Sequence, residues 1–168
     1  MTNKIPKITV KSEIKKVDNT NPLIKDVVCL IGGFEDDKTV NTPTFCSTLT
    51  EAEKIFGDDD TIDANLALKQ IFREDITGCL IVNVTTSTGS GDNINYQRNV
   101  TKTKLLEALA TVNLIDFDLL YIASELTDEL IVELDGFCGN RFENKRPCGY
   151  IGVGTRASAA AYITTSEK

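Results

Sequence analysis

Short apolar runs alternate with amphipathic segments along most of this chain of 168 residues. Val27–Ile31 is a continuous run of apolar side chains, the pattern of a strand that is buried on both faces of a sheet. Gly78–Val84 repeats this pattern, and Thr44–Ser47 predicts a short strand between the two. Phe117–Ala123 and Gly149–Val153 predict two further strands nearer the end of the chain.

Helices are predicted between these strands. The first begins at Thr48 or Thr50, because a glutamate three residues after each of them completes a capping box, and it ends at Gly57. From Gly78 onward strands and helices alternate, which predicts an α/β fold with a mostly parallel sheet flanked by helices. The other predicted helices span about 62–74, Lys102–Asn113 with Leu105, Leu106, Leu109 and Val112 buried, Thr127 to about Arg141, and Ala157–Thr164.

Residues 1–21 differ from the rest of the chain. Polar and apolar side chains alternate from Lys7 to Lys11, and Ile14 keeps the phase, which is a strand period in a lysine-rich segment. Such a strand pairs inside the fold, pairs with another molecule or remains disordered. We expect an extended N-terminal arm at 1–21, a strand–helix part at 22–93 and the start of an α/β core at 94–168. The Ser-, Thr-, Gly- and Asn-rich stretch 85–99 is expected to be a loop or a subdomain boundary.

Composition removes several classes of function. The chain has 18 Lys and Arg against 25 Asp and Glu, a net charge of −7, so no nucleic-acid partner is expected. It has no histidine, which removes Ser-His-Asp and Cys-His catalysis and leaves zinc only thiolate and carboxylate ligands. No apolar run is long enough for a membrane span, so direct membrane insertion is not expected. The cysteines form no C-x-x-C motif and are expected to be reduced: Cys29, Cys46, Cys79, Cys138 and Cys148.

One glycine-rich turn suggests a ligand site. Gly152–Ala157 matches G-x-G-x-x-A between a predicted strand and a predicted helix, the context of a dinucleotide fingerprint. The acidic residue that completes such a fingerprint should lie about twenty positions further on, beyond Lys168. We interpret the turn as tight packing between strand and helix. The alternative is a doubly wound nucleotide-binding or regulatory α/β module that uses this turn.

Acidic and serine-containing stretches have structural explanations. Asp58–Asp60 and Asp63 lack the glycine and distal glutamate of a calcium loop, and carboxylates before a helix suit capping and the helix dipole. Gly89–Gly91 is not a G-x-S-x-G nucleophile turn. Glu125 and the Asp128–Glu129 pair stand at a predicted helix start, so a carboxylate-pair hydrolase has no specific support.

The order of elements from Val27 to Gly57 resembles the N-terminal part of the contractile phage tail sheath protein family, which includes the sheaths of contractile bacteriocins and injection systems. An Ile-Gly strand leads through an Asn-Thr-Pro turn to a helix with a Thr-x-x-Glu start and a Phe-Gly end. Phe117–Ala123, Glu125–Glu129 and Arg146–Tyr150 extend the resemblance along the chain. It implies a sheath core of subtilisin-like topology, incomplete at the C-terminus, that is not an enzyme and has no catalytic residues, cofactor or metal.

The resemblance also implies a mechanical function. Sheath subunits polymerise with copies of themselves in hexameric rings and a helical sleeve around a tail tube protein, and drive contraction and injection. Baseplate and tail terminator proteins are the other expected partners, in a virion tail or contractile bacteriocin particle assembled in the cytoplasm of a bacterial host. The N-terminal arm is expected to exchange strands between subunits through Ile8, Val10 and Ile14. Since sheath proteins are longer than this chain, we expect a truncated product or a reduced variant.

Overall fold

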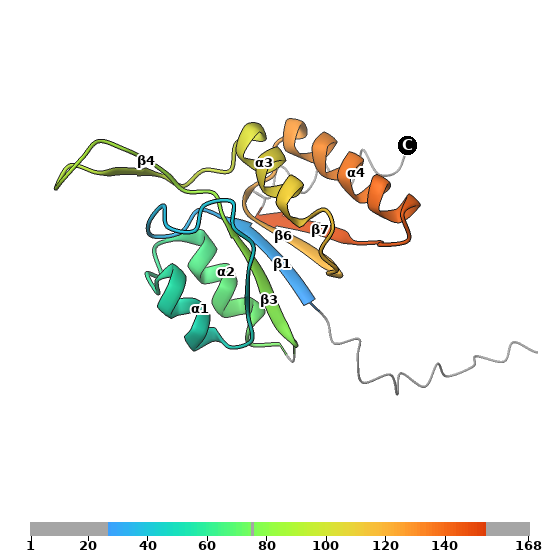
Figure 1. Cartoon of the computed structure of the whole chain (residues 1–168), viewed down its shortest axis with the longest axis horizontal. Helices are drawn as coiled ribbons and strands as arrows, with labels where there is room; N and C mark the ends of the chain where they lie inside the picture. Colours follow the sequence, from blue (N-terminus) through green and yellow to red (C-terminus); the bar gives the residue numbers. More distant parts are fainter. Residues whose placement is uncertain (1–26, 75, 154–168) are drawn as a thin grey trace, which may run out of the picture.

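The computed structural model describes residues 27–74 and 76–153. A five-stranded sheet lies between two layers of helices, and a two-stranded hairpin projects from this body (Figure 1). The arrangement confirms the predicted α/β fold with a mostly parallel sheet. The strands are β1 (Val27–Gly32), β2 (Thr44–Cys46), β3 (Gly78–Asn83), β4 (Thr86–Thr88), β5 (Asn95–Gln97), β6 (Leu119–Glu125) and β7 (Gly149–Val153). The helices are α1 (Leu49–Phe56), α2 (Asp63–Ile71), α3 (Lys102–Val112) and α4 (Asp128–Glu143).

The strands of the large sheet follow the order β2-β3-β1-β6-β7. β1 pairs in parallel with β3 on one side and with β6 on the other, and β7 continues the parallel sheet beside β6. β2 runs antiparallel to β3 and places Thr44 opposite Ile81. The first strand along the described part of the chain is therefore central in the sheet.

Alternate side chains of β1 enter two different cores. Val28 and Leu30 pack with α1 and α2, whereas Cys29 and Ile31 pack with α3 and α4. β3 and β6 show the same alternation, because successive side chains of a strand point to opposite faces. Figure 1 shows the two helix layers on opposite sides of the sheet. Burial on both faces explains why β1 and β3 are continuous apolar runs.

The predicted elements are present, with shifted boundaries. The cap of α1 is Thr48, whose Oγ1 accepts a hydrogen bond from the Glu51 N–H at 3.2 Å, whereas Thr50 lies inside the helix. α2 is shorter than the predicted segment 62–74, and β6 starts two residues after Phe117. The prediction that Leu106 is buried is wrong, since it is 42% exposed. The sheet-facing positions of α3 are Leu105, Ala108, Leu109 and Val112.

The loop predicted at 85–99 contains a β-hairpin instead. β4 and β5 pair antiparallel, with Thr86 opposite Gln97. Gly89 and Gly91 turn the chain at the tip with φ of 100° and 61°, in the left-handed region that favours glycine. Nearly all hairpin side chains are exposed, so no apolar alternation in the sequence marks these strands.

Two predicted segments lie outside the described residues. These are the N-terminal arm at 1–21 and the helix at Ala157–Thr164. The proposed division of the chain at 21/22 and 93/94 stays a prediction. In the described part, the helices are too short or too polar to cross a membrane.

Candidate functional site at the carboxyl ends of the strands

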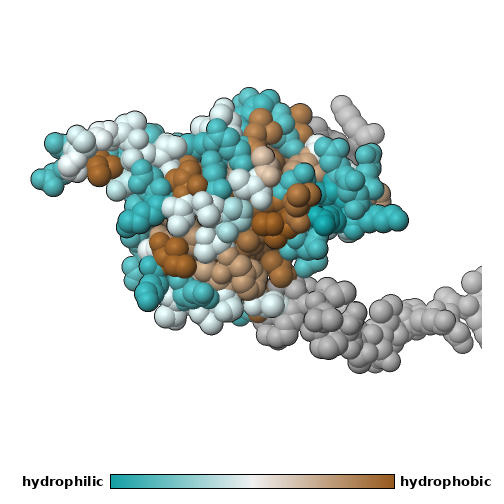
Figure 2. All heavy atoms as spheres, in the orientation of Figure 1, coloured by the Kyte–Doolittle hydropathy of each residue, from teal (hydrophilic) through white to brown (hydrophobic). Residues whose placement is uncertain are grey.

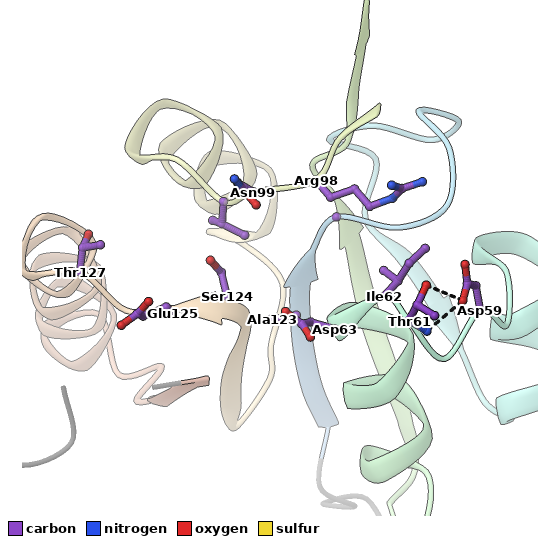
Figure 3. A pocket seen from close by; sticks show the side chains of 12 residues that line it. Asp59, Thr61, Ile62, Asp63, Arg98, Asn99, Ala123, Ser124, Glu125 and Thr127 are labelled. Carbon is purple, nitrogen blue, oxygen red and sulfur yellow. Dashed lines mark hydrogen bonds between the residues drawn. The ribbon is translucent and has the colours of Figure 1, made fainter. Parts of the chain in front are cut away.

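A cavity of about 550 Å³ lies at the carboxyl ends of β1 and β6 (Figure 3). After β1 the chain moves to β3 on one side of the sheet, and it later returns to β6 on the other side. Ligands of open α/β sheets bind at such a point, where the strand order reverses. The cavity is therefore the natural candidate for a binding site. It is lined by Gly33, Asp59, Thr61, Ile62, Asp63, Arg98, Asn99, Val100, Ala123, Ser124, Glu125 and Thr127.

Helix starts and strand ends build this cavity. α2, α3 and α4 all begin at its rim, next to Ile62, Val100 and Thr127 respectively. The N-terminus of a helix attracts anions through its free N–H groups and its dipole. Three carboxylates nevertheless line the cavity against one guanidinium. This negative balance opposes a phosphate ligand despite the three helix starts.

The guanidinium of Arg98 holds the loop that follows β1. Nε donates to the carbonyl of Phe34 at 2.7 Å and Nη2 donates to the carbonyl of Glu35 at 2.9 Å. In Figure 3 the group points away from Glu125 and Thr127. Gly33 allows the backbone of Arg98 to lie close to this loop, because a Cβ at Gly33 would lie 2.2 Å from the backbone oxygen of Arg98. Arg98 therefore has a structural role in the described part of the molecule.

The acidic stretch before α2 is used for local structure. Asp59 accepts hydrogen bonds from the N–H and hydroxyl of Thr61, at 2.9 and 2.7 Å, and these bonds hold the pKa of its carboxyl below the usual range. The carboxylate of Glu35 accepts from the N–H groups of Asp58 and Asp59 at 2.8 and 2.9 Å. Lys69 reaches the Asp58 carbonyl at 2.9 Å. Across residues 27–74 and 76–153, no group of three or more His, Cys, Asp or Glu could hold a metal ion.

Two buried polar residues at the end of β3 hold the same loop from the other side. Asn83 is 1% exposed, and its amide donates to the carbonyls of Asp36 and Lys38 at 2.8 and 2.9 Å. Thr85 is fully buried, and its hydroxyl oxygen accepts from the Phe34 N–H at 2.8 Å. Buried polar groups in proteins are normally hydrogen-bonded, as Asn83 and Thr85 are. Together with Arg98, these two residues set the conformation of the loop after β1 through hydrogen bonds.

The hydroxyl groups of the cavity also support its walls. Thr61 donates to Asp59, and Thr127 caps α4 by accepting from the Leu130 N–H at 3.4 Å. A nucleophilic hydroxyl requires a base within hydrogen-bonding distance that is itself oriented by a third group. The geometry does not assemble that arrangement at Ser124 from the described residues. The cavity is a junction of strand ends and helix starts.

Only the first two residues of the glycine-rich turn Gly152–Ala157 belong to the described part of the chain. Gly152 lies in β7, and a Cβ at this position would stand 2.4 Å from Cγ of Leu126. This glycine permits close packing of β7 against Leu126, while the predicted packing between this strand and the helix that follows the turn stays a prediction. Gly154–Ala157, where a phosphate would bind, lie outside the described residues, as do the strand-exchange positions Ile8, Val10 and Ile14.

The structure reveals one pair of side chains that the sequence did not suggest. Cys138 and Cys148 lie together, on α4 and just before β7, with their sulfur atoms 3.4 Å apart. All five cysteines are free thiols, and Cys29, Cys46 and Cys79 are buried. The two cysteines are ten positions apart in the sequence. That spacing matches no redox or metal-binding motif, so only the tertiary structure could reveal the contact.

Comparison with known proteins gives one line of evidence, and it is structural. No family model matches the chain, and no curated protein sequence matches it. Its fold resembles the crystal structure of a sheath tail protein from Desulfitobacterium hafniense, with a TM-score of 0.53 and 12% sequence identity. The match covers 89% of this chain and 56% of that protein, so the chain spans little more than half of its length. The chain has a sheath-like fold. At this identity the likeness concerns the fold alone.

Proposed function

We propose that this chain is a structural, non-enzymatic subunit of a contractile tail sheath. Its copies would polymerise in hexameric rings and a helical sleeve around a tail tube and drive contraction and injection. The observation that carries this proposal is the sheath-like fold, which extends over 89% of the chain. The order of motifs from Val27 to Gly57 supports it independently, because it rests on sequence rather than on coordinates.

Exposed apolar side chains on the described surface suit a protein that assembles. Leu114, Val132 and Phe142 are 80%, 66% and 72% exposed, so each of these large apolar side chains is available to contact another molecule. Figure 2 shows apolar groups gathered in several separate places on one face, between hydrophilic residues. A subunit that contacts several neighbours needs several small contact areas on its surface.

We infer that the N-terminal arm joins neighbouring subunits by adding a strand to a sheet. Ile8, Val10 and Ile14 would face the acceptor, while Lys7, Thr9 and Lys11 would face solvent. Backbone hydrogen bonds supply the affinity in such an exchange, and alternate side chains fix the register. The expected partners are further copies of the chain, a tube protein and the baseplate and terminator proteins of a virion tail or contractile bacteriocin particle.

Electron microscopy of the purified chain tests the proposal. We expect hexameric rings or striated sleeves, and sedimentation should show concentration-dependent association. Monodisperse monomers at every concentration, alone and with the tube protein from the same operon, would contradict the assembly function.

A pair of single substitutions tests the arm. Val10→Asp places a charge on the face expected to pair, whereas Thr9→Asp places the same charge on the opposite face one residue away. We expect Val10→Asp to abolish association and Thr9→Asp to preserve it. Equal effects of the two substitutions would exclude strand exchange in the proposed register.

A further inference from the structure

Two cysteine sulfur atoms lie close together on neighbouring elements of the fold. Cys138 of α4 and Cys148, which precedes β7, have their Sγ atoms 3.4 Å apart. Both residues are half-buried, so small solutes can reach them. A disulfide bond is about 2.05 Å long, so the two sulfur atoms must approach each other further for the bond to close.

A buried cation stands beside this pair. Arg141 follows Cys138 on α4 and is only 2% exposed. Its Nη1 donates to the carbonyls of Asn113 and Ile115, each at 3.1 Å, and its guanidinium lies 4.1 Å from the ring centre of Phe117. In the described part of the chain no carboxylate pairs with this guanidinium, and its Nε has no hydrogen-bond partner. A buried positive charge of this kind favours an anion nearby.

The two thiols are not equivalent in this environment. A hydrogen bond from Cys138 and the positive charge of Arg141 lower the pKa of Cys148, although partial burial opposes the shift. The same hydrogen bond, together with burial, raises the pKa of Cys138. Asp135 on α4, whose carboxylate accepts from the Tyr150 hydroxyl of β7 at 2.7 Å, is the nearby acidic group that also raises the pKa of Cys138. Arg141 also hydrogen-bonds to Cys148, whereas it acts on Cys138 only through its charge, so we assign the thiolate of the pair to Cys148.

We propose that Cys138 and Cys148 form an oxidation site, at which a hydroperoxide reacts with Cys148 and Cys138 then closes an intramolecular disulfide. In the first step the Cys148 thiolate attacks one peroxide oxygen. The S–O bond forms, the O–O bond breaks, and the leaving hydroxide or alkoxide takes up a proton. In the second step the sulfur of Cys138 attacks the sulfur of the sulfenic acid, the S–S bond forms as the S–O bond breaks, and the released hydroxide takes the Cys138 proton to become water. The two sulfur atoms are oxidised and the peroxide is reduced.

The other three cysteines are internal controls. Burial raises the pKa of the Cys46 thiol to about 11 and that of Cys79 to about 12, and it also raises the pKa of Cys29. The thiolate is the nucleophile, and each unit of pKa changes its population by about tenfold. These thiols should therefore react with peroxide at least about a hundredfold more slowly than Cys148 while the chain stays folded.

Peptide mass spectrometry of the reduced, full chain treated with hydrogen peroxide tests the proposal. We expect the free thiols to fall from five to three, the mass to fall by two hydrogen atoms, and one linked peptide to contain Cys138 and Cys148. A reductant should restore all five thiols. The rate should fall as pH is lowered, because protonation removes the Cys148 thiolate. An unchanged thiol count, or a first reaction at Cys29, Cys46 or Cys79, would overturn the proposal.

Two variants assign the roles within the pair. In Cys138→Ser the sulfenic acid at Cys148 has no resolving thiol, so a 1,3-dione probe should label the Cys148 peptide. In Cys148→Ser the same peroxide treatment should leave Cys138 unlabelled. Alkylation of Cys46 reports unfolding in both variants, because this thiol is buried in the native fold. Labelling of Cys138 in folded Cys148→Ser at the rate of Cys148 would contradict the assignment. None of these results depends on sheath assembly.

Discussion

β3 and β7 belong to the same mostly parallel sheet, yet their surroundings differ along their whole length. Every residue of β3 is buried, with strands on both sides and helices over both faces. β7 alternates between exposed and half-buried positions, and Ile151 and Val153 remain 44% and 39% exposed. The α1/α2 layer packs on β1, β3 and β6, and its core cluster does not include β7. β3 therefore belongs to a region whose packing supplies stability, whereas the surface around β7 is open to contacts.

This contrast fits the proposed role of an assembling subunit. A closed region around β1 and β3 gives the chain a stable body, because burial of apolar area is the main source of stability. An open region around β7 leaves apolar side chains that another element or another molecule can cover. The contrast leads to three measurable differences, which are given below in order of decreasing size.

The largest difference is expected between two matched truncations of aliphatic side chains. Leu30→Ala removes a fully buried side chain of β1 and should lower the free energy of unfolding by about 2–5 kcal/mol. Ile151→Ala removes a half-exposed side chain of β7 and should cost less than about 1 kcal/mol. Urea denaturation with equal slopes for both variants measures the two losses. Similar losses at the two positions would show that β7 is covered in solution.

A second difference concerns two glycines that lie near the carboxyl ends of β1 and β7. A Cβ at Gly33 would stand 2.2 Å from the backbone oxygen of Arg98, whereas a Cβ at Gly152 meets the side chain of Leu126. The side chain of Leu126 can relieve the contact by changing its rotamer, whereas at Gly33 the backbone of Arg98 would have to move. We expect Gly33→Ala to cost about 1–3 kcal/mol, and Gly152→Ala less. Thermal melts compare the two variants, with Gly139→Ala as the control, because Gly139 lies in α4 and its added Cβ would meet nothing beyond its own helix within 4 Å. The control should be neutral or slightly stabilising. A larger loss at Gly152 would place rigid packing at β7 and contradict the comparison.

The same contrast explains which parts of the fold the sequence could predict. β1 and β3 are buried on both faces, so their apolar runs indicate strands directly. The strand order was not predictable, because the pairing of β1 with β6 joins residues about ninety positions apart through contacts that local patterns do not encode. The β4–β5 hairpin was missed for the opposite reason, since its exposed side chains carry no apolar signal.

For the candidate site, residues with a local role were predictable. A helix cap such as Thr127 can be predicted, because its side chain hydrogen-bonds to a residue only three positions away. The cavity between β1 and β6 and the Cys138–Cys148 contact depend on elements that meet only after folding. Arg141 is an ordinary basic residue of a helix C-terminus in the sequence, and only the structure shows it buried against Phe117.

The smallest difference tests whether α1 stabilises the closed region around β3. Thr48 accepts from the Glu51 N–H at 3.2 Å, and the Glu51 carboxylate accepts from the Ser47 N–H at 2.9 Å. Thr48→Ala removes the cap and should cost about 1 kcal/mol. Thr50→Ala, two residues on, should be neutral or slightly stabilising, because alanine is the better helix former.

Hydrogen exchange of the β3 amides distinguishes between two explanations for the loss of stability in Thr48→Ala. If α1 is part of the layer that stabilises the sheet, Thr48→Ala should accelerate exchange in β3 by the factor expected from its loss of global stability, about fivefold for 1 kcal/mol. Faster exchange confined to the first turn of α1 would mean that the helix frays on its own. The closed region would then consist of β1, β3 and α2 alone.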